Sequence, residues 1–393
     1  MKHLKKIAAF AVTVFSLTAC QKESKLLSEN PALQEEPVSA SNRNNNEEES
    51  EGGGKHVYTL SNQTTGNVVM EFNRASNGTL TFNAAYPTGG TGTGGGLGNQ
   101  GAVILSEGED DNVLLAVNPG SNSVSSFKIT GNGLQLKSTV SSGGMRPVSI
   151  TQHDDIVYVL NAGGMGNISG FKLGENNKLT AIANSTRPLS STASGAAQIS
   201  FVNEGKVVAI TEKATNKIIT YTINESGTPG AMHSITSANP TPFGFAVGNN
   251  GNIFVSEAVG GAAGASTLSS YHINNNGTIT LAAGPVGANQ SAACWVVITN
   301  NGKYAYTTNT ASNNLSTFNI NTGTGSISVN TAISATTGMG PIDAALSNNS
   351  KYLYILNSGS HTVGVYAVAN NGGLSAVQTV TGLPAGANGL AAK

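Results

Sequence analysis

The stretch Tyr352–Val368, YLYILNSGSHTVGVYAV, predicts the fold of the chain. Its first five residues are apolar and rich in aromatic and β-branched side chains, and Asn357–His361 has the composition of a tight turn. Thr362–Val368 then alternates small or polar residues with large apolar ones, the period of a half-buried strand. The stretch therefore predicts a β-hairpin, and similar stretches occur seven times.

Two markers define the repeat. The residue that ends the first strand of each hairpin is, in order, Asn62, Asn118, Asn161, Glu212, Glu257, Asn309 and Asn357. The next strand always carries a large aromatic ring: Phe72, Phe127, Phe171, Tyr221, Tyr271, Phe318 and Tyr366. The spacing, between 43 and 56 residues, is typical of a propeller or a solenoid. One ring per unit predicts a recurring core position between packed sheets.

The last complete unit predicts four antiparallel strands, at Pro341–Leu346, Tyr352–Leu356, Thr362–Val368 and Leu374–Val380. Four strands per unit and seven units predict an all-β, seven-bladed β-propeller. The first unit begins at His56 without its innermost strand, whereas Gly386–Ala392 resembles an innermost strand with nothing after it. We therefore expect the C-terminal strand to join the first blade and close the ring, so that residues 56–393 form one domain.

The N-terminus predicts an export signal. Lys2, Lys5 and Lys6 precede a short apolar run, and Leu17-Thr18-Ala19-Cys20 resembles the lipobox of bacterial lipoproteins. This resemblance implies a signal peptide over residues 1–19 and a lipid on Cys20, with an ordinary cleaved signal as the alternative. Residues 20–55 are polar and predict a disordered tether. The expected location is the bacterial cell envelope, lipid-anchored at the outer membrane, with surface display left open.

Composition narrows the function. The net charge is −1 and no basic patch occurs, which argues against a nucleic-acid partner. The histidines and cysteines show no metal-ligand spacing, so neither a metal nor a cofactor is expected. The expected partners are a small polar ligand or an envelope protein, with the membrane reached through the lipid anchor, and the chain is expected to be a monomer.

We use loop face for the face where innermost strands start and second strands end, and turn face for the opposite one. The sequence predicts the ligand site at the tunnel mouth on the loop face, where charges are few. The candidate ligand-binding residues there are Arg146, Arg187, Glu212, Glu257, Trp295 and Asp343. Alternatively, Trp295 packs between blades and Asp343 caps a backbone turn. The glycine-rich segment Gly89–Gly98 is expected to be a loop, or a lid, at this mouth.

The units resemble the bacterial lactonase family of seven-bladed propellers, which includes 6-phosphogluconolactonase and carboxymuconate-lactonizing enzymes. Residues 241–258, 292–310 and 341–359 carry the resemblance. It implies a histidine near the start of an innermost strand, with arginine and glutamate close by. Here the seven starting positions hold Gly101, Arg146, Ala197, Phe243, Trp295, Asp343 and Asn388, so the histidine has no counterpart.

Three functions remain open. The first is an envelope-anchored propeller that binds a small polar ligand or a protein partner at the tunnel mouth. The second is a lactone hydrolase or lactonizing enzyme, with Arg146, Glu257 and Asp343 as candidate catalytic residues for acid–base work and oxyanion stabilisation. The third is a purely structural role in an envelope complex.

Overall fold

A computed structural model describes residues 55–106 and 112–393. The predicted signal peptide (1–19), Cys20 and the predicted tether up to residue 54 lie outside the described residues. Within the described ranges, no helix has the length and apolar character needed to cross a bilayer. Two single-turn 3-10 helices, η1 (Asn249–Gly251) and η2 (Val259–Gly261), are the helical elements of this part of the chain.

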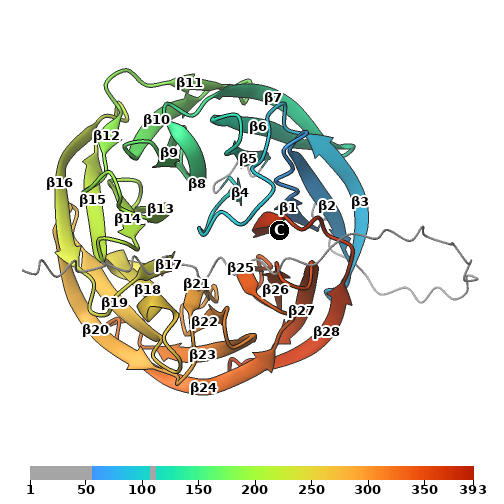
Figure 1. The fold of residues 1–393 in the computed structure, drawn as a ribbon, viewed down its shortest axis with the longest axis vertical. Helices are drawn as coiled ribbons and strands as arrows, with labels where there is room; N and C mark the ends of the chain where they lie inside the picture. Colours follow the sequence, from blue (N-terminus) through green and yellow to red (C-terminus); the bar gives the residue numbers. More distant parts are fainter. Residues whose placement is uncertain (1–54, 107–111) are drawn as a thin grey trace, which may run out of the picture.

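Seven antiparallel sheets form a ring around a central tunnel (Figure 1). The innermost strands are β4 (Val103–Leu105), β8 (Met145–His153), β13 (Ala196–Val202), β17 (Pro242–Val247), β21 (Ala293–Ile298), β25 (Pro341–Leu346) and β29 (Asn388–Ala392). The second strands are β1 (His56–Leu60), β5 (Val113–Asn118), β9 (Ile156–Gly163), β14 (Val207–Glu212), β18 (Asn252–Glu257), β22 (Tyr304–Asn309) and β26 (Tyr352–Asn357).

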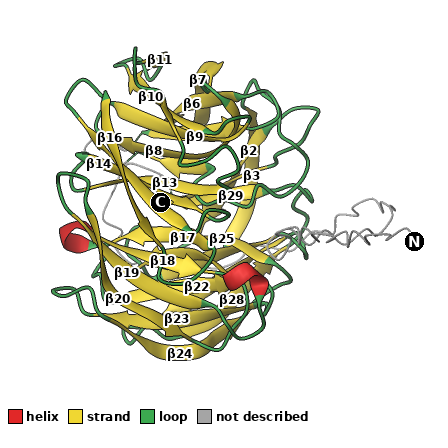
Figure 2. Ribbon diagram, turned by 60° about the vertical axis from the view of Figure 1, so that its left-hand side comes forward, coloured by secondary structure: helices red, strands yellow, loops and turns green. Residues whose placement is uncertain are grey.

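The third strands are β2 (Val68–Arg74), β6 (Ser123–Thr130), β10 (Asn167–Leu173), β15 (Lys217–Ile223), β19 (Thr267–Ile273), β23 (Asn314–Ile320) and β27 (Thr362–Val368). The outer strands are β3 (Leu80–Pro87), β7 (Gly133–Ser141), β11 (Leu179–Ala181) with β12 (Arg187–Pro188), β16 (Pro229–Thr236), β20 (Ile279–Gly287), β24 (Ile327–Thr336) and β28 (Leu374–Val380). The turned view in Figure 2 shows these sheets stacked around the ring. The predicted all-β, seven-bladed fold is confirmed.

The chain ends close the ring as predicted. β29 pairs antiparallel with β1, from Val57 opposite Ala392 to Leu60 opposite Asn388, so the last strand is the innermost strand of the first blade. The backbone N–H of Lys393 also donates to the carbonyl of His56, 2.8 Å away. Every strand of the first blade therefore has its neighbours, although that blade joins the two ends of the propeller.

The aromatic residue of each third strand is a core residue. All seven rings are at most 5% exposed, and they pack with apolar residues of adjacent sheets. The seventh blade shows how closely the pattern predicts the strands. β25, β27 and β28 have the predicted bounds, and β26 is one residue longer because Asn357 still pairs with Thr362.

Candidate functional site: a cavity in the central tunnel

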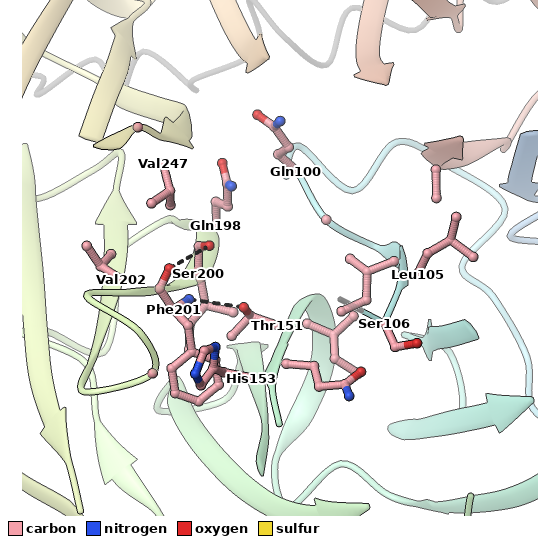
Figure 3. Close-up of a pocket in the computed structure, with 18 of the residues that line it drawn as sticks. Gln100, Leu105, Ser106, Thr151, His153, Gln198, Ser200, Phe201, Val202 and Val247 are labelled. Atoms are coloured by element: carbon pink, nitrogen blue, oxygen red, sulfur yellow. Dashed lines mark hydrogen bonds between the residues drawn. The ribbon is translucent and has the colours of Figure 1, made fainter. Parts of the chain in front are cut away.

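A cavity of about 1190 Å³ occupies the tunnel. Its walls are residues of innermost strands, chiefly β4, β8, β13, β25 and β29, and its rim includes the turns at Asn203–Lys206 and Gly248–Gly251. Those turns connect innermost to second strands, so the cavity extends to the turn face. Figure 3 shows Gln198 and Ser200 of β13, and Gln100 from the segment before β4, beside the open centre.

The opposite end of the tunnel is closed by the segment Gly95–Gly101, which leads into β4. In Figure 1 this cyan segment runs in toward the middle of the ring. Gln100 binds the backbone of Val296 with both ends of its amide: Nε2 donates to the carbonyl at 2.8 Å, and Oε1 accepts from the N–H at 3.2 Å. Its own N–H donates to the carbonyl of Ala197. The segment is thus held by β13 and β21, on different sides of the tunnel.

Trp295 is part of this closure. Its side chain is 1% exposed, its ring lies 4.9 Å from that of Phe243, and its indole N–H donates to the carbonyl of Asn99 at 2.5 Å. Asn99 is itself fully buried, and its side-chain amide donates to the carbonyl of Val148. Trp295 therefore packs between blades, which the sequence analysis gave as the alternative to ligand binding.

Lys213 also holds the segment. Its ammonium donates to the carbonyl of Gly98 and lies 4.5 Å from the centre of the Phe243 ring. Burial, assisted by the nearby positive charge of Arg146, lowers the pKa of Lys213 to about 7. Gly244 leaves room for the Gln100 side chain, because a Cβ at position 244 would clash with Gln100 Oε1. The structure thus places the cavity at the turn face, whereas the predicted mouth on the loop face is closed.

The innermost strands share a β-bulge that orients the residue after it. The register shifts immediately before Ser149, Gln198, Trp295 and Asp343, which are equivalent positions in four blades. A bulge bends a strand and redirects the side chain beside it. Gln198 uses its whole amide to brace the next blade, since Oε1 accepts from the N–H of Phe245 and Nε2 donates to the same residue's carbonyl.

Asp343 differs from the residues at the equivalent positions because it carries a carboxyl group. It lines the cavity, its side chain is 1% exposed, and Oδ1 accepts from the N–H of Ala344 at 2.8 Å. Oδ2 is buried and has no hydrogen-bond partner among the described residues. Burial raises the pKa of Asp343 well above its ordinary value, opposed by the backbone N–H groups of Ala344 and Leu390. Of the six predicted ligand-binding residues, Asp343 alone is among the described residues that line the cavity.

Glu212 and Glu257 lie inside their blades. Both are fully buried at the end of a second strand, the position that asparagine occupies in the other five units. Glu257 accepts from the hydroxyls of Thr267 and Ser269 on the third strand, at 2.6 and 2.7 Å. Asn118 at the equivalent position donates to hydroxyls of its own third strand. At Glu257 and Asn118 the position therefore ties the second strand to the third, whereas Glu212 accepts from Ser190 and from Thr215 in the adjoining turn.

The two arginines lie apart from the cavity lining. Arg146 has a left-handed backbone (φ 52°), and its N–H donates to Asn122 Oδ1 at 2.7 Å. Arg187 donates to the carbonyls of Asn184, Thr186 and Pro229. The proposed catalytic set of Arg146, Glu257 and Asp343 is therefore not gathered around this cavity.

Several lining residues were not predicted, namely Gln100, Thr151, His153, Gln198, Ser200 and Lys206. Thr151, His153 and Ser200 lie on the later halves of innermost strands. The residues that vary between units at those positions were the signal that could have found them. His153 ends β8, with Nε2 3.8 Å from Asp154 Oδ2, and packs on Phe201. No group of three His, Cys, Asp or Glu side chains suited to a metal occurs in residues 55–106 and 112–393.

Comparison with known proteins supports the architecture. Residues 264–392, about a third of the chain, match the family model described as Lactonase, 7-bladed beta-propeller. This region runs from just before β19 to the end of β29 and includes Asp343. The chain is a seven-bladed β-propeller, and the matched third of it is similar to that family. A search of curated proteins finds no match.

Solved structures share the fold at low identity. A candidate 6-phosphogluconolactonase from Bacteroides uniformis is 18% identical with a TM-score of 0.64, over 85% of this chain and 99% of that one. A protein from Lactobacillus plantarum is 16% identical with a TM-score of 0.68, over 86% and 99%. The periplasmic gluconolactonase of Pseudomonas aeruginosa is 15% identical with a TM-score of 0.64, over 85% and 98%. At such low sequence identities, the similarity shows the fold alone.

Proposed function

We propose that this propeller binds a small polar ligand in its tunnel and is held at the cell envelope by a lipid on Cys20. The supporting observation is the cavity itself: it is closed at the loop face by Gly95–Gly101, open at the turn face, and lined by polar residues such as Gln152, Ser200 and Lys206. A concave site with a few convergent polar groups is the usual form of a small-molecule site. Binding, rather than catalysis, fits the separation of Arg146 and Glu257 from Asp343.

The ligand site is tested by filling it. Ser200 lies in the cavity wall, and its hydroxyl bonds to the neighbouring carbonyl of Phe201 at 3.3 Å. Titration calorimetry should detect binding of a neutral probe from a panel of sugar lactones and polyols, glucono-1,5-lactone first. Ser200→Trp should abolish that binding, whereas Ser375→Trp, on the exposed outer strand β28, should leave it unchanged. Binding that survives Ser200→Trp, or a panel without any binder, would overturn the proposal.

Lactone hydrolysis is the second candidate, because the matched family region contains Asp343. A buried acid of raised pKa suits general-acid work on a lactone ring oxygen. A hydrolysis screen with residues 55–393 separates the two functions. We expect the probes to bind without turnover. Turnover that disappears in Asp343→Ala would make the protein a lactone hydrolase.

The anchor has its own test. Labelling of cells with a fatty acid should mark the wild-type protein, which should fractionate with membranes. Cys20→Ser should lose the label, because the lipid would be attached through the Cys20 thiol. A wild-type protein that carries no lipid would refute the anchor and leave the ligand site untouched.

A further inference from the structure

The wall of the tunnel cavity is divided by polarity around the ring. Neighbouring innermost strands pack against each other in the order β29, β4, β8, β13, β17, β21 and β25, and β25 packs against β29. Partly exposed polar side chains enter the lining from the neighbours β8 and β13, whereas those from β4, β17, β25 and β29 are apolar. We use polar side for Gln152, His153 and Ser200, and apolar side for Ile104, Leu105, Val247, Leu346 and Ala392.

The apolar side is continuous over three adjacent blades. Its members on β25, β29 and β4 belong to blades that follow one another around the ring. Val247 on β17 adds a side chain that is 39% exposed. Figure 3 shows Leu105 and Val247 on opposite sides of the open centre. Aliphatic surface that water would otherwise cover in a concave site favours an apolar ligand group.

The polar side offers hydrogen-bonding groups that the protein uses incompletely. The Ser200 hydroxyl donates to the carbonyl of Phe201 over 3.3 Å, and its oxygen accepts no hydrogen bond from a described residue. The His153 side chain is 38% exposed, and its Nε2 lies 3.8 Å from Asp154 Oδ2, beyond hydrogen-bond distance. Gln152 Nε2 donates to the carbonyl of Asp154 at 2.8 Å. A ligand with hydroxyl groups can donate to these side chains and accept from them.

The accessible formal charges of the lining lie at the rim. Lys206 and Glu204 form an ion pair there, with 3.6 Å between the charged atoms, and both side chains are more than half exposed. Asp343 is the acid of the wall, but its side chain is 1% exposed and its carboxyl is not presented to the cavity. The polar and apolar sides contain no lysine, arginine or acidic residue. Ligand atoms beside them therefore need no formal charge.

We propose that the tunnel binds an uncharged amphipathic molecule, in which a hydroxylated head hydrogen-bonds to the polar side and an alkyl group covers the apolar side. The proposal rests on the proposed ligand site and narrows its ligand from a polar molecule to a sugar-like head with an aliphatic tail. The cavity volume of about 1190 Å³ has room for both parts. A sugar or polyol alone would leave the apolar side against water, so an alkyl derivative of the same sugar should bind more tightly.

Two glucosides with the same head separate the contributions of head and tail. Methyl β-D-glucoside presents little more than the sugar, and hexyl β-D-glucoside adds an alkyl chain. Titration calorimetry uses residues 20–393 with Cys20→Ser, which avoids a detergent that would compete with the chain. We expect the hexyl glucoside to bind at least about tenfold more tightly, with a more negative heat-capacity change that marks apolar burial.

Two variants should act on different parts of the ligand. Leu346→Asn puts an amide on the apolar side and should weaken binding of the hexyl glucoside about fivefold, while the methyl glucoside is unaffected. Ser200→Ala removes a hydrogen bond to the head and should weaken both glucosides by the same factor, about threefold to tenfold. The matched control is Leu281→Asn, because Leu281 is 47% exposed on the outer strand β20, and it should change neither affinity.

A conservative variant covers the case in which circular dichroism shows that Leu346→Asn is unfolded. Val247→Thr keeps the shape of the apolar side but adds a hydroxyl, and it should weaken binding of the hexyl glucoside about threefold. Its control is Val329→Thr, because Val329 is 36% exposed on the outer strand β24, and this change should have no effect.

The outcomes distinguish the ligand class from the ligand site. Equal affinity for the two glucosides, or apolar-side variants that weaken both equally, would overturn the amphipathic ligand and leave the site in place. Binding of the hexyl glucoside that survives Ser200→Trp would place it outside the tunnel and overturn the site. If neither glucoside nor any lactone or polyol binds, the proposed function fails, and the amphipathic ligand fails with it.

Discussion

Glu257 is the most heavily hydrogen-bonded of the buried carboxyl groups, and its replacement tests the tie between second and third strands. Glu257→Gln keeps the shape but puts an NH₂ group among five donors. Because hydrogen bonds to a charged group contribute more than neutral ones, we expect the free energy of unfolding to fall by about 2–3 kcal/mol. Urea denaturation gives this value.

The matched control is Glu204→Gln. Glu204 is 86% exposed in a turn, and its substitution should change the free energy of unfolding by less than about 0.5 kcal/mol. A loss as small in Glu257→Gln would contradict the structural role assigned to that carboxylate.

Lys213 predicts a pH dependence of stability. Its pKa is about 7 in the folded protein and near the ordinary lysine value when unfolded. Between these values the unfolded chain binds more protons, so Lys213 makes stability rise with pH over this window, and its cost is fully present below pH 7. Lys213→Met should flatten that rise. Unfolding free energies measured between about pH 7 and 10 would contradict the placement of Lys213 if both proteins gave the same slope.

For single residues, the position in the repeat predicted the structural role better than the residue type did. Glu212 and Glu257 drew attention because they are charged, yet both are buried at the repeat position that asparagine holds elsewhere, and their hydroxyl and N–H partners lie within the protein. Asp343 and Trp295 were recognised as equivalent positions, and the bulge register confirms this equivalence. Which of them faces a cavity depends on the neighbouring blades, and that information is absent from the local sequence.

The segment Gly95–Gly101 is the element that closes the tunnel, and Trp295 is its largest contact. Trp295→Phe removes the hydrogen bond to the carbonyl of Asn99 and part of the buried ring. We expect a loss of about 1–2 kcal/mol and faster amide hydrogen exchange at Asn99–Gly101. Hydrogen-exchange mass spectrometry measures this.

Ile218→Val is the control for that experiment, because Ile218 is buried on the third strand β15, in a core cluster that holds none of the residues bonded to the segment. It should lower the stability without a selective effect on Asn99–Gly101. Unchanged exchange in Trp295→Phe would contradict the role of Trp295 in holding the segment.

The closure was only partly predictable. The glycine-rich stretch indicated a loop on this face, but glycines carry no periodicity that could say where the loop goes. Its course is fixed by contacts with Val148, Ala197 and Val296, which come from three other blades. The same contacts explain why the expected mouth is closed and the cavity extends to the other face.

For the whole molecule, ring closure by β29 should be essential. Deletion of residues 388–393 removes five strand residues and leaves the edge of β1 unpaired. We expect the truncated protein to lose its cooperative thermal transition and to aggregate, because exposed edges template association. Deletion of residues 1–54 is the contrasting variant and should leave the transition in place. A folded, monomeric protein without residues 388–393, seen by circular dichroism and size-exclusion chromatography, would contradict this closure.

The fold of the whole molecule was predictable because the same sequence pattern occurs seven times. The hairpin at Tyr352–Val368, the ring aromatics and the orphan strand at Gly386–Ala392 all constrain the same ring. The cavity depends on how seven different inner strands meet at the axis, and only one copy of that arrangement exists in the chain.

The central claim is that the tunnel, entered from the turn face, is the ligand site. A crystal structure of residues 55–393 soaked with glucono-1,5-lactone tests it most directly. We predict density for the probe in the cavity, in contact with Thr151 and Ser200 in its wall. Density only on the loop face above Trp295, or none in the tunnel, would contradict the account.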